Sequence, residues 1–312
     1  MTHSILPFPM LPHGSPLRLV EGLKLIVLSA AMLLALALSA RADEAALAKH
    51  IAKLEADLDA RIGVLVLDTE SDWRWAHRED ERFLMASTFK TLLCGAVLDR
   101  VDQRALSLDK AVEIKRRDLV PYAPVVEDHV GETMTIGALC LATVDMSDNA
   151  AANLLIAELG GTQEVTDFLR KIGDPDTRLD RLEPEVNLFT QGDPRDTSTP
   201  TGMLTSWQAL LLDEALTDAS RAQLADWLRH GSVTGQFIRA HAPETWRIWD
   251  KSGGGRHHTR NLIAMVQPPE DAPYLIAIFV SDTPADWDTR NAAVAQIGAA
   301  IVDVIAARRS GA

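Results

Sequence analysis

Ser87 and Lys90 stand three residues apart, and the apolar segment 91–98 that follows them is typical of a buried helix. Positions i and i+3 share one face of a helix, so the lysine amine is expected to lie beside the serine hydroxyl. A serine becomes a good nucleophile when a neighbouring group takes its proton, and an amine with a lowered pKa can do that. The free N–H groups of a first helical turn could also stabilise an oxyanion. The chemistry that the pair could do is acyl transfer. S-x-x-K by itself is common, and taken alone it is better explained as an N-cap serine followed by a solvated lysine; the other motifs of the chain favour the nucleophile.

Two further polar segments fit this nucleophile. Ser147-Asp148-Asn149 opens a predicted helix and offers a second hydroxyl and a side-chain amide; alone it would be a helix cap, with Asp148 as the capping residue. The segment 251–255, Lys-Ser-Gly-Gly-Gly, ends a predicted strand and combines a cation, a hydroxyl and an unobstructed backbone. Alone it would be a strand end and a glycine turn. Together the two segments suggest a cationic groove beside a second hydroxyl.

A long polar loop interrupts an otherwise compact helical region, from Arg181 through Asp196. Loops of this length inside a compact domain are usually functional or disordered. Glu183 and Asn187 are four residues apart in this loop, so a carboxylate and an amide could hold a water molecule between them. Tyr122 could place an aromatic ring at the rim of a cleft, with a packing tyrosine as the alternative.

The spacing of apolar residues predicts the elements that position these groups. Helices are expected over 43–60, 149–159, 207–216, 220–230 and 292–306, and strands over 62–67, 73–76, 247–251, 260–266 and 274–281. Strands from both ends of the chain must pair in one sheet, because a lone hairpin is unstable. The prediction is an α/β fold: a five-stranded antiparallel sheet with terminal helices, built from 43–86 and 229–312, and an inserted all-helical domain over 87–228. A ligand cleft is expected between the two domains.

The N-terminal segment has the plan of a secretory signal peptide. An apolar run over 25–38 follows Arg18 and Lys24 and ends in Ser39-Ala-Arg-Ala42, which offers a cleavage site after Ala42. The run is shorter than the roughly 20 residues that a spanning helix needs, which favours cleavage over a retained anchor. The part before Lys24 is long for such a peptide, so Met10 is an alternative start. The mature chain would be a periplasmic protein that begins at Asp43.

The charge and the two cysteines fit an exported enzyme. The 312-residue chain has a net charge of −13, and without residues 1–42, which carry +2, it has −15. This charge argues against nucleic acid or an anionic membrane as a partner. Cys94 and Cys140 invite a disulfide in an exported protein, with two buried thiols as the alternative. His257-His258 has no carboxylate or cysteine close by in the sequence, so no metal site is expected.

The ordered set of motifs S-x-x-K, S-D-N, E-P-E-x-N and K-S-G resembles that of the class A serine β-lactamases. The resemblance spans nearly all of the mature chain and includes Tyr122 and the Arg290-Asn291 stretch before the last helix. Cys94 and Cys140 match the disulfide pair of the common Gram-negative penicillinases. The resemblance implies the β-lactamase/transpeptidase-like fold, a monomer, no cofactor, and a small-molecule β-lactam as substrate.

The family's mechanism can be carried onto matching residues. Ser87 would attack the β-lactam carbonyl, with the backbone N–H groups of Ser87 and Gly254 as the oxyanion hole. Ser147 would pass a proton to the leaving nitrogen. The acylation base would be Lys90 or, through a water molecule, Glu183; both alternatives stay open. Glu183 would then activate the deacylating water, which Asn187 would also hold.

The remaining matches imply binding and structural roles. The substrate would be held by Tyr122, Asn149, Asn187, Lys251, Ser252, Gly253 and Arg260, of which Lys251, Ser252 and Arg260 would gather its carboxylate. Asp148 is expected to cap a helix, and Arg181 and Asp196 to close the Glu183 loop as an ion pair. The Glu183–Pro184 peptide bond is expected to be cis.

Departures from the family bear on the choice of substrate. Ala86 and Gly255 stand where the carbapenem-hydrolysing branch has a cysteine pair, and Gly254 lacks the hydroxyl of many cephalosporin-active members. The segment 256–258 is an unusual turn beside the cleft. These features favour a penicillinase with weaker cephalosporin activity.

Two other functions share part of this constellation. A penicillin-binding D,D-peptidase has the serine, the lysine and the K-S-G element, but it lacks the loop glutamate. A non-hydrolysing β-lactam sensor would be acylated and stay so. The presence of Glu183 with Asn187 favours the hydrolase over both.

Overall fold

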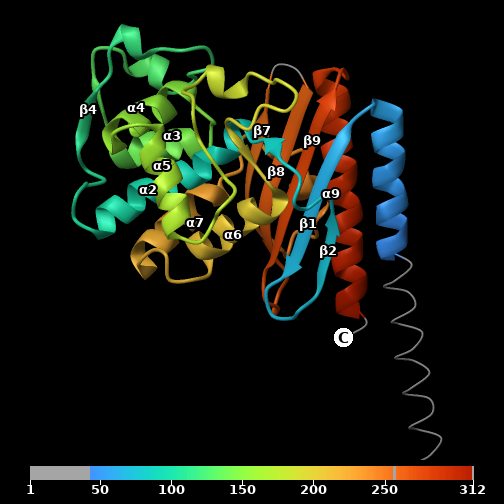
Figure 1. Ribbon diagram of the computed structural model, residues 1–312. Coiled ribbons are helices and arrows are strands. Elements are labelled where there is room, and N and C mark those ends of the chain that lie inside the picture. Colours follow the sequence, from blue (N-terminus) through green and yellow to red (C-terminus); the bar gives the residue numbers. More distant parts are fainter. Residues whose placement is uncertain (1–42, 256–257, 311–312) are drawn as a thin grey trace, which may run out of the picture.

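The structure, a computed structural model, describes residues 43–255 and 258–310. The predicted signal peptide, its cleavage site after Ala42, and Arg256 and His257 of the unusual turn lie outside the described residues. Figure 1 shows a sheet with helices on both of its faces: a helix over 43–58 and α9 (Trp287–Ser310) on one face, and the large group of helices around α2 on the other.

The main sheet joins strands from both ends of the chain, as predicted. Its order is β2-β1-β9-β8-β7, and every neighbouring pair is antiparallel. The strands are β1 (Arg61–Asp68), β2 (Arg74–His77), β7 (Arg247–Gly254), β8 (His258–Gln267) and β9 (Tyr274–Thr283). The predicted fold class, an α/β protein with a five-stranded antiparallel sheet, is confirmed.

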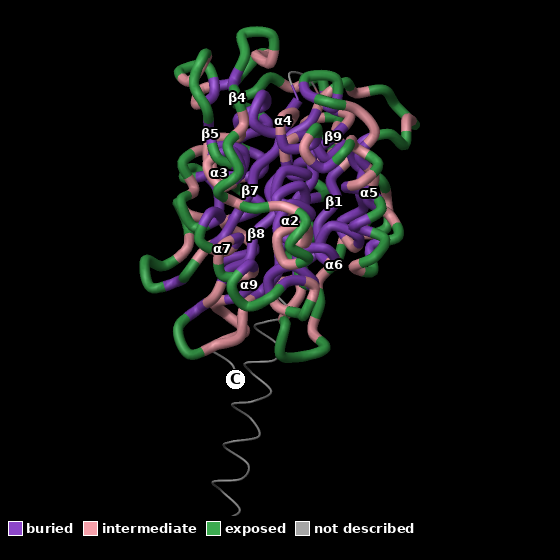
Figure 2. The backbone as a smooth tube through the Cα atoms, turned by 90° about the vertical axis from the view of Figure 1, so that its left-hand side faces the viewer, coloured by how far each residue is buried: buried purple, intermediate pink, exposed green. Residues whose placement is uncertain are grey.

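Alternate residues of each strand enter two separate cores, because successive side chains of a strand point to opposite faces. On β9, Leu275, Ala277 and Phe279 pack against the large group of helices. Ile276 and Ile278 pack on the opposite face, against α9 and the helix over 43–58. In Figure 2 the buried stretches run through the middle of the molecule and the exposed ones lie at its margins. α9 is long and apolar enough to cross a membrane, but its apolar residues, among them Val294, Ile297 and Ile301, are buried in this second core.

The helices of the first core surround α2. They are α2 (Phe89–Asp102), α3 (Ile136–Val144), α4 (Asn149–Leu159), α5 (Thr162–Lys171), α6 (Pro200–Leu211) and α7 (Asp218–Arg229). The short α8 (Ile238–His241) packs against α9 instead, and its Ile238 belongs to the second core. Ten consecutive residues of α2, from Phe89 to Leu98, are buried, so it is the central helix of the group. Short strands and 3-10 turns connect the helices: β3 (Phe83–Leu84), η1 (Ala86–Thr88), β4 (Ala111–Glu113), η2 (Arg116–Asp118), η3 (Val126–His129), β5 (Thr133–Thr135), η4 (Glu185–Asn187) and β6 (Thr197–Ser198).

Of the helix boundaries that differ from the prediction, two have a clear local reason. The helix expected over 207–216 is α6, which begins at Pro200, because the Thr199 hydroxyl accepts the Gly202 N–H and proline occupies the first turn. Ser87 was expected in the first turn of an α-helix. It lies instead in the 3-10 turn η1, and α2 begins two residues later.

The disulfide predicted between Cys94 and Cys140 is not formed in the structure. Both residues are free and fully buried, one on α2 and the other on α3. The two side chains are close, since the Cys94 Sγ lies 3.7 Å from the Cys140 carbonyl oxygen. In this structure they act as small apolar side chains at a helix contact, which is the alternative that the apolar sequence around each left open.

Candidate active site

The turn that carries Ser87 is held by two strands of the main sheet. The side-chain amide of Asn261 on β8 donates to the carbonyl oxygens of Leu84 and Met85, at 2.8 and 2.9 Å. Gly253 on β7 approaches so closely that a Cβ there would lie 2.7 Å from the Met85 oxygen and 3.0 Å from the Ser87 nitrogen. Any other residue at 253 would push the strand away from the nucleophile. The glycine motif therefore brings Lys251, Ser252 and Gly254 next to Ser87.

Three residues around Ser87 adopt left-handed backbone conformations. Ala86 has φ +45°, Tyr122 +65° and Ser147 +59°. Such conformations are costly for residues with side chains and cluster at functional sites. Each of the three stands in, or directly beside, one of the motifs found in the sequence.

Lys90 is fully buried and connects three motifs. Its Nζ donates to the Ser147 carbonyl oxygen at 2.8 Å and to Asn149 Oδ1 at 2.6 Å, and it lies 3.1 Å from Glu183 Oε1. The Ser147 hydroxyl is 3.5 Å from the same nitrogen. Burial lowers the pKa of Lys90, and the neighbouring Glu183 carboxylate opposes that effect.

The contact expected between Lys90 and Ser87 is absent. Within residues 43–255 and 258–310, the Ser87 hydroxyl has no hydrogen-bond partner, and the amine is directed to Ser147 and Glu183 instead. The reason is the attraction of the buried cation to a buried carboxylate, which an adjacent neutral hydroxyl does not match.

Glu183 is held from its backbone and from its carboxylate. Its peptide bond to Pro184 is cis, as predicted. Asn153 on α4 accepts from the Glu183 N–H at 2.9 Å and donates to its carbonyl oxygen at 2.8 Å. The Asn187 amide donates directly to Glu183 Oε2, so the pair predicted to hold a water molecule is in contact. Sequence reasoning missed Asn153, which lies on the helix that the Ser147-Asp148-Asn149 motif begins.

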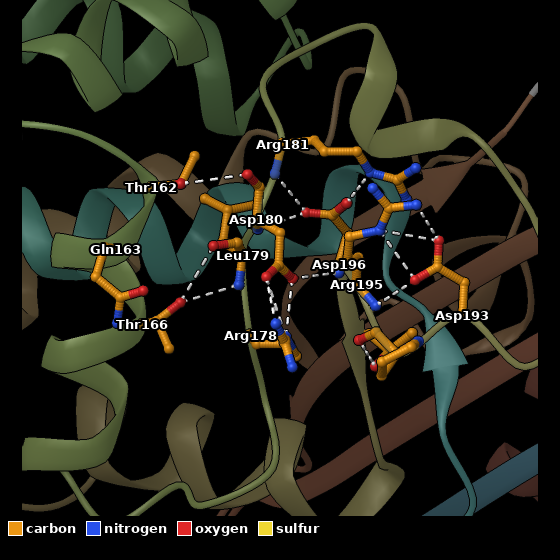
Figure 3. A network of polar contacts seen from close by, with 12 residues as sticks. Thr162, Gln163, Thr166, Arg178, Leu179, Asp180, Arg181, Asp193, Arg195 and Asp196 are labelled. Atoms are coloured by element: carbon orange, nitrogen blue, oxygen red, sulfur yellow. Dashed lines mark hydrogen bonds and ion pairs between the residues drawn. The ribbon is translucent and has the colours of Figure 1, made fainter.

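The loop that carries Glu183 is closed at its base by a buried carboxylate. Asp196 Oδ1 accepts the N–H groups of Asp180 and Arg181 at 2.7 and 3.0 Å, and Oδ2 accepts from the Arg181 guanidinium. Asp180 in turn accepts the Asp196 N–H at 2.9 Å and pairs with Arg178. Figure 3 shows this reciprocal arrangement, with the more peripheral Arg195–Asp193 pair beside it. The expected Arg181–Asp196 ion pair is therefore part of a larger network.

The second hydroxyl and the amide of the Ser147-Asp148-Asn149 motif are placed by Asp148. Its carboxylate caps α4 through the Ala151 N–H, as predicted, and also accepts the N–H groups of Val125 and Val126. Asn149, expected to face a ligand, also donates to the Pro121 carbonyl oxygen at 2.8 Å. Asn149 therefore connects Lys90 to the segment that carries Tyr122. The Tyr122 side chain is 56% exposed, at the rim of the site.

Two buried cations lie on the opposite side of the site. Lys251 is fully buried and donates to the Ser252 carbonyl oxygen, and Arg260 is 5% exposed and donates to Asn291 Oδ1 and the Gly253 carbonyl oxygen. Neither forms an ion pair with a carboxylate in the described part of the chain. Burial, with Lys90 and Arg260 as like charges, lowers the pKa of Lys251 well below its ordinary value. Burial and Arg290 lower the pKa of Arg260 to about 10.

These groups surround one cavity of about 360 Å³ between the sheet and the helices. Its lining includes nine residues named from the sequence: Ser87, Tyr122, Ser147, Asn149, Asn187, Ser252, Gly253, Gly254 and Arg260. Lys90, Glu183 and Lys251 lie behind this lining and are buried. Sequence reasoning missed Val233, Gln236 and Trp287 in the lining; the only signal was the position of Trp287 next to the Arg290-Asn291 stretch.

Known proteins share both the sequence and the fold. The chain matches the β-lactamase enzyme family over residues 46–305. It is 50% identical to a β-lactamase of Rhodobacter capsulatus over 260 residues, which are 83% of this chain and 88% of that protein. It is 40% identical to β-lactamase PSE-4 of Pseudomonas aeruginosa over 256 residues, 82% of this chain and 89% of the relative.

Solved structures agree. An ancestral class A β-lactamase of Gram-negative bacteria superposes with a TM-score of 0.80 at 48% identity, covering 82% of this chain and 99% of that one. A β-lactamase from Xanthomonas campestris superposes with a TM-score of 0.82 at 41% identity, covering 84% and 98%. The chain belongs to the β-lactamase enzyme family, as a β-lactamase of the class A type.

Proposed function

We propose that this β-lactamase hydrolyses penicillins, and more weakly some cephalosporins, through an acyl-enzyme on Ser87. The observation that supports this most is the Lys90–Glu183 ion pair at 3.1 Å, buried directly behind a cavity that Ser87, Ser147 and Asn187 line. A cation and a carboxylate held together beside two hydroxyls can move protons both onto and off the reacting groups.

Acylation joins the Ser87 oxygen to the β-lactam carbonyl carbon and breaks the ring C–N bond. The Ser87 proton passes to Lys90 or, through water, to Glu183. Ser147, whose hydroxyl lies 3.5 Å from the Lys90 amine, delivers a proton to the ring nitrogen. The N–H groups of Ser87 and Gly254 stabilise the oxyanion. Ser147 regains a proton from the Lys90 amine, which holds the proton that left Ser87 or receives it from Glu183. In the second half, Glu183 takes a proton from a water molecule, the water oxygen bonds to the acyl carbon, the ester C–O bond breaks, and the proton returns to the Ser87 oxygen; Asn187 orients the Glu183 carboxylate.

The binding of the substrate follows from the charges. Lys251 and Arg260 are buried cations without carboxylate partners in the described chain, so an anionic ligand would compensate them. Every penicillin and cephalosporin carries such a carboxylate next to the lactam. We assign Lys251, Ser252 and Arg260 to that carboxylate, and Asn149 and Tyr122 to the side chain of the drug.

The protein would act as a periplasmic monomer that confers resistance. The proposal includes export by residues 1–42 and cleavage after Ala42. The intact mass of the protein recovered from the periplasm should correspond to a chain that begins at Asp43, and a mass that includes residues 1–42 would contradict cleavage.

Glu183→Gln tests the mechanism. The purified variant, given a penicillin, should accumulate a protein adduct with the mass of the whole drug, because the second half of the reaction has lost its base. Wild-type protein should turn the drug over and show no lasting adduct. Glu185→Gln is the matched control, since Glu185 is an exposed carboxylate two residues along the same loop, and it should behave as wild type.

Three results would overturn parts of the proposal. Normal turnover by Glu183→Gln would remove Glu183 from the mechanism. A lasting adduct on the wild-type protein would indicate a D,D-peptidase or a sensor. Activity that a metal chelator abolishes would contradict a serine mechanism.

A further inference from the structure

Trp287 occupies the space beside the strand that carries Gly254. A Cβ at position 254 would lie 2.8 and 2.9 Å from two carbons of the indole ring, and 3.1 Å from Arg260 Cδ. Cβ atoms essentially never come within 3.0 Å of a neighbouring heavy atom, so the two indole carbons would have to move, and the approach to Arg260 would be tight. The indole of Trp287 therefore fills the space that a side chain at position 254 would need.

The same indole ring holds Arg260. The guanidinium carbon lies 4.5 Å from the Trp287 ring and 4.7 Å from the Phe237 ring, so the cation is packed between two aromatic rings. A flat cation over aromatic faces is attracted by their negative faces. Asn291 and the Gly253 carbonyl oxygen fix its direction by hydrogen bonds. Arg260 thus keeps one orientation without a carboxylate of the described chain.

Trp287 also faces the ligand space. It lines the cavity together with Gly254 and Arg260, and it is 43% exposed although it is a large apolar residue. An exposed aromatic ring at the wall of a pocket is a usual contact for a ligand. The ring therefore links the oxyanion strand, the carboxylate-binding cation and the open cavity.

We propose that Trp287 and Gly254 form a single specificity-determining pair, in which the indole ring bounds the space for the substrate ring that bears the carboxylate. This inference rests on the proposed function. The bicyclic substrate must span from the carbonyl carbon at Ser87 to the carboxylate at Arg260. Trp287 lies beside Gly254, whose N–H belongs to the oxyanion end, and against the Arg260 guanidinium at the carboxylate end. A penicillin has a compact five-membered ring there. A cephalosporin has a six-membered ring with a substituent next to its carboxylate, and the indole opposes that substituent.

A double-mutant cycle tests the pair. The proteins are wild type, Gly254→Ala, Trp287→Ala and the double variant, and the readouts are kcat and KM for one penicillin and one cephalosporin with a bulky substituent, together with Tm. Gly254→Ala should lower kcat/KM for penicillin by about tenfold, because relief of the overlap moves either the oxyanion strand or the indole that holds Arg260. It should also lower Tm. In the Trp287→Ala background the same change should cost less than about twofold.

Trp287→Ala alone should raise the ratio of cephalosporin to penicillin kcat/KM by about fivefold, which is the size of effect that extra room in a pocket has on specificity. Gly235→Ala is the control for an added methyl group, since a Cβ there meets nothing within 4 Å. Trp75→Ala, a half-buried tryptophan on β2, is the control for loss of an indole. Both controls should leave the ratio unchanged.

The outcomes separate the two claims. Equal costs of Gly254→Ala in both backgrounds, or an unchanged ratio in Trp287→Ala, would overturn the pair while wild-type turnover stands. Absence of turnover by the wild-type protein would overturn the proposed function and the specificity assignment with it.

Discussion

Lys251 and Arg260 are cations that burial alone would disfavour. Their pKa values are lowered because the charged forms lose water, and because Lys90, Arg260 and Arg290 are like charges close to them. A cation with a lowered pKa is ready to be compensated by an anion that arrives with the substrate. At the scale of the residue, the positive charges of Lys251 and Arg260 thus lack a carboxylate partner until the substrate binds.

This electrostatic state predicts the alkaline limb of the pH profile. The ordinary pKa of lysine is about 10.4, and lysine is charged below its pKa. The pKa of Lys251 is well below the ordinary value, so its charge is lost at a correspondingly lower pH as the pH rises. We expect kcat/KM for penicillin, which reports the free enzyme, to fall in that range. In Lys251→Arg the limb should move upward, since a guanidinium keeps its proton.

The measurement is kcat/KM from about pH 6 to about pH 11, a range that brackets the ordinary lysine pKa. Lys49→Arg, an exposed lysine of the N-terminal helix, is the control and should keep the wild-type limb. An alkaline limb at the same pH in Lys251→Arg would show that another group is responsible.

At the scale of the element, the loop that carries Glu183 is fixed where its two ends, near Arg181 and Asp196, meet. Asp196 closes the base of the loop with three hydrogen bonds, all from donors in or next to the loop, and its side chain is fully buried. A loop fixed in this way can hold a carboxylate against Lys90 without regular secondary structure around it. The geometry of Glu183 therefore depends on a residue that does not line the cavity.

Asp196→Ala should consequently affect both stability and turnover. Loss of the buried partner leaves two backbone N–H groups without an acceptor and Arg181 without its carboxylate, with only the Leu188 carbonyl oxygen left to accept from it, which should cost about 3 kcal/mol of unfolding free energy. We also expect kcat to fall by about tenfold through misplacement of Glu183. Denaturant unfolding and steady-state kinetics measure the two effects.

Asp193→Ala is the matched control in the same loop. Its partner Arg195 is exposed, so the pair should contribute little. Equal losses in the two variants would show that general loop destabilisation, rather than the buried base, explains the result.

The contact between α2 and α3 makes a prediction about the thiols. Burial raises the pKa of Cys140 well above its ordinary value, and the thiolate is the reactive form. The native protein should therefore not react with a thiol reagent, and the unfolded protein should bind two equivalents without prior reduction. Mass spectrometry counts the labels; no labels on the unfolded, unreduced protein would establish the disulfide in place of the free thiols.

At the scale of the whole molecule, the sheet separates two cores with different tasks. The core shared with the helices lies beneath the cavity and includes Phe83, Phe89 and Phe279. The other core joins Leu47, Ile51 and α9 to the far face of the sheet. Phe237 of the far core touches Arg260, and α9 supplies Trp287 to the cavity, but among the described residues the helix over 43–58 has no such contact. A change on that helix should therefore alter stability and leave the cavity intact, because the sheet stands between them.

Ile51→Ala tests this separation. Ile51 is fully buried, and its truncation should cost about 3 kcal/mol of unfolding free energy. The value of kcat/KM at a temperature well below Tm should stay as in wild type. Lys53→Ala on the exposed side of the same helix is the control and should change neither quantity; a large loss of kcat/KM in folded Ile51→Ala would contradict the separation.

Local patterns were enough to predict much of this protein. Alternating and helical apolar spacing located the five strands and the terminal helices, because burial of one face imposes a period on the sequence. Motif chemistry named nine residues of the cavity lining, and Asp148 was recognised as a cap from its place before α4. The beginning of α6 was missed, because a threonine and proline cap decided it rather than apolar spacing.

The sequence by itself determined which groups are present and how the chain builds a sheet from both ends, since these follow from residue type and short-range spacing. Only the tertiary structure decided which groups meet. Lys90 lies against Glu183 rather than Ser87, Asn153 and Asn261 hold the loop and the turn from distant elements, and Trp287 fills the space beside Gly254. These contacts join residues far apart in the chain, and burial of charge and competition for volume select them only after the two layers have packed.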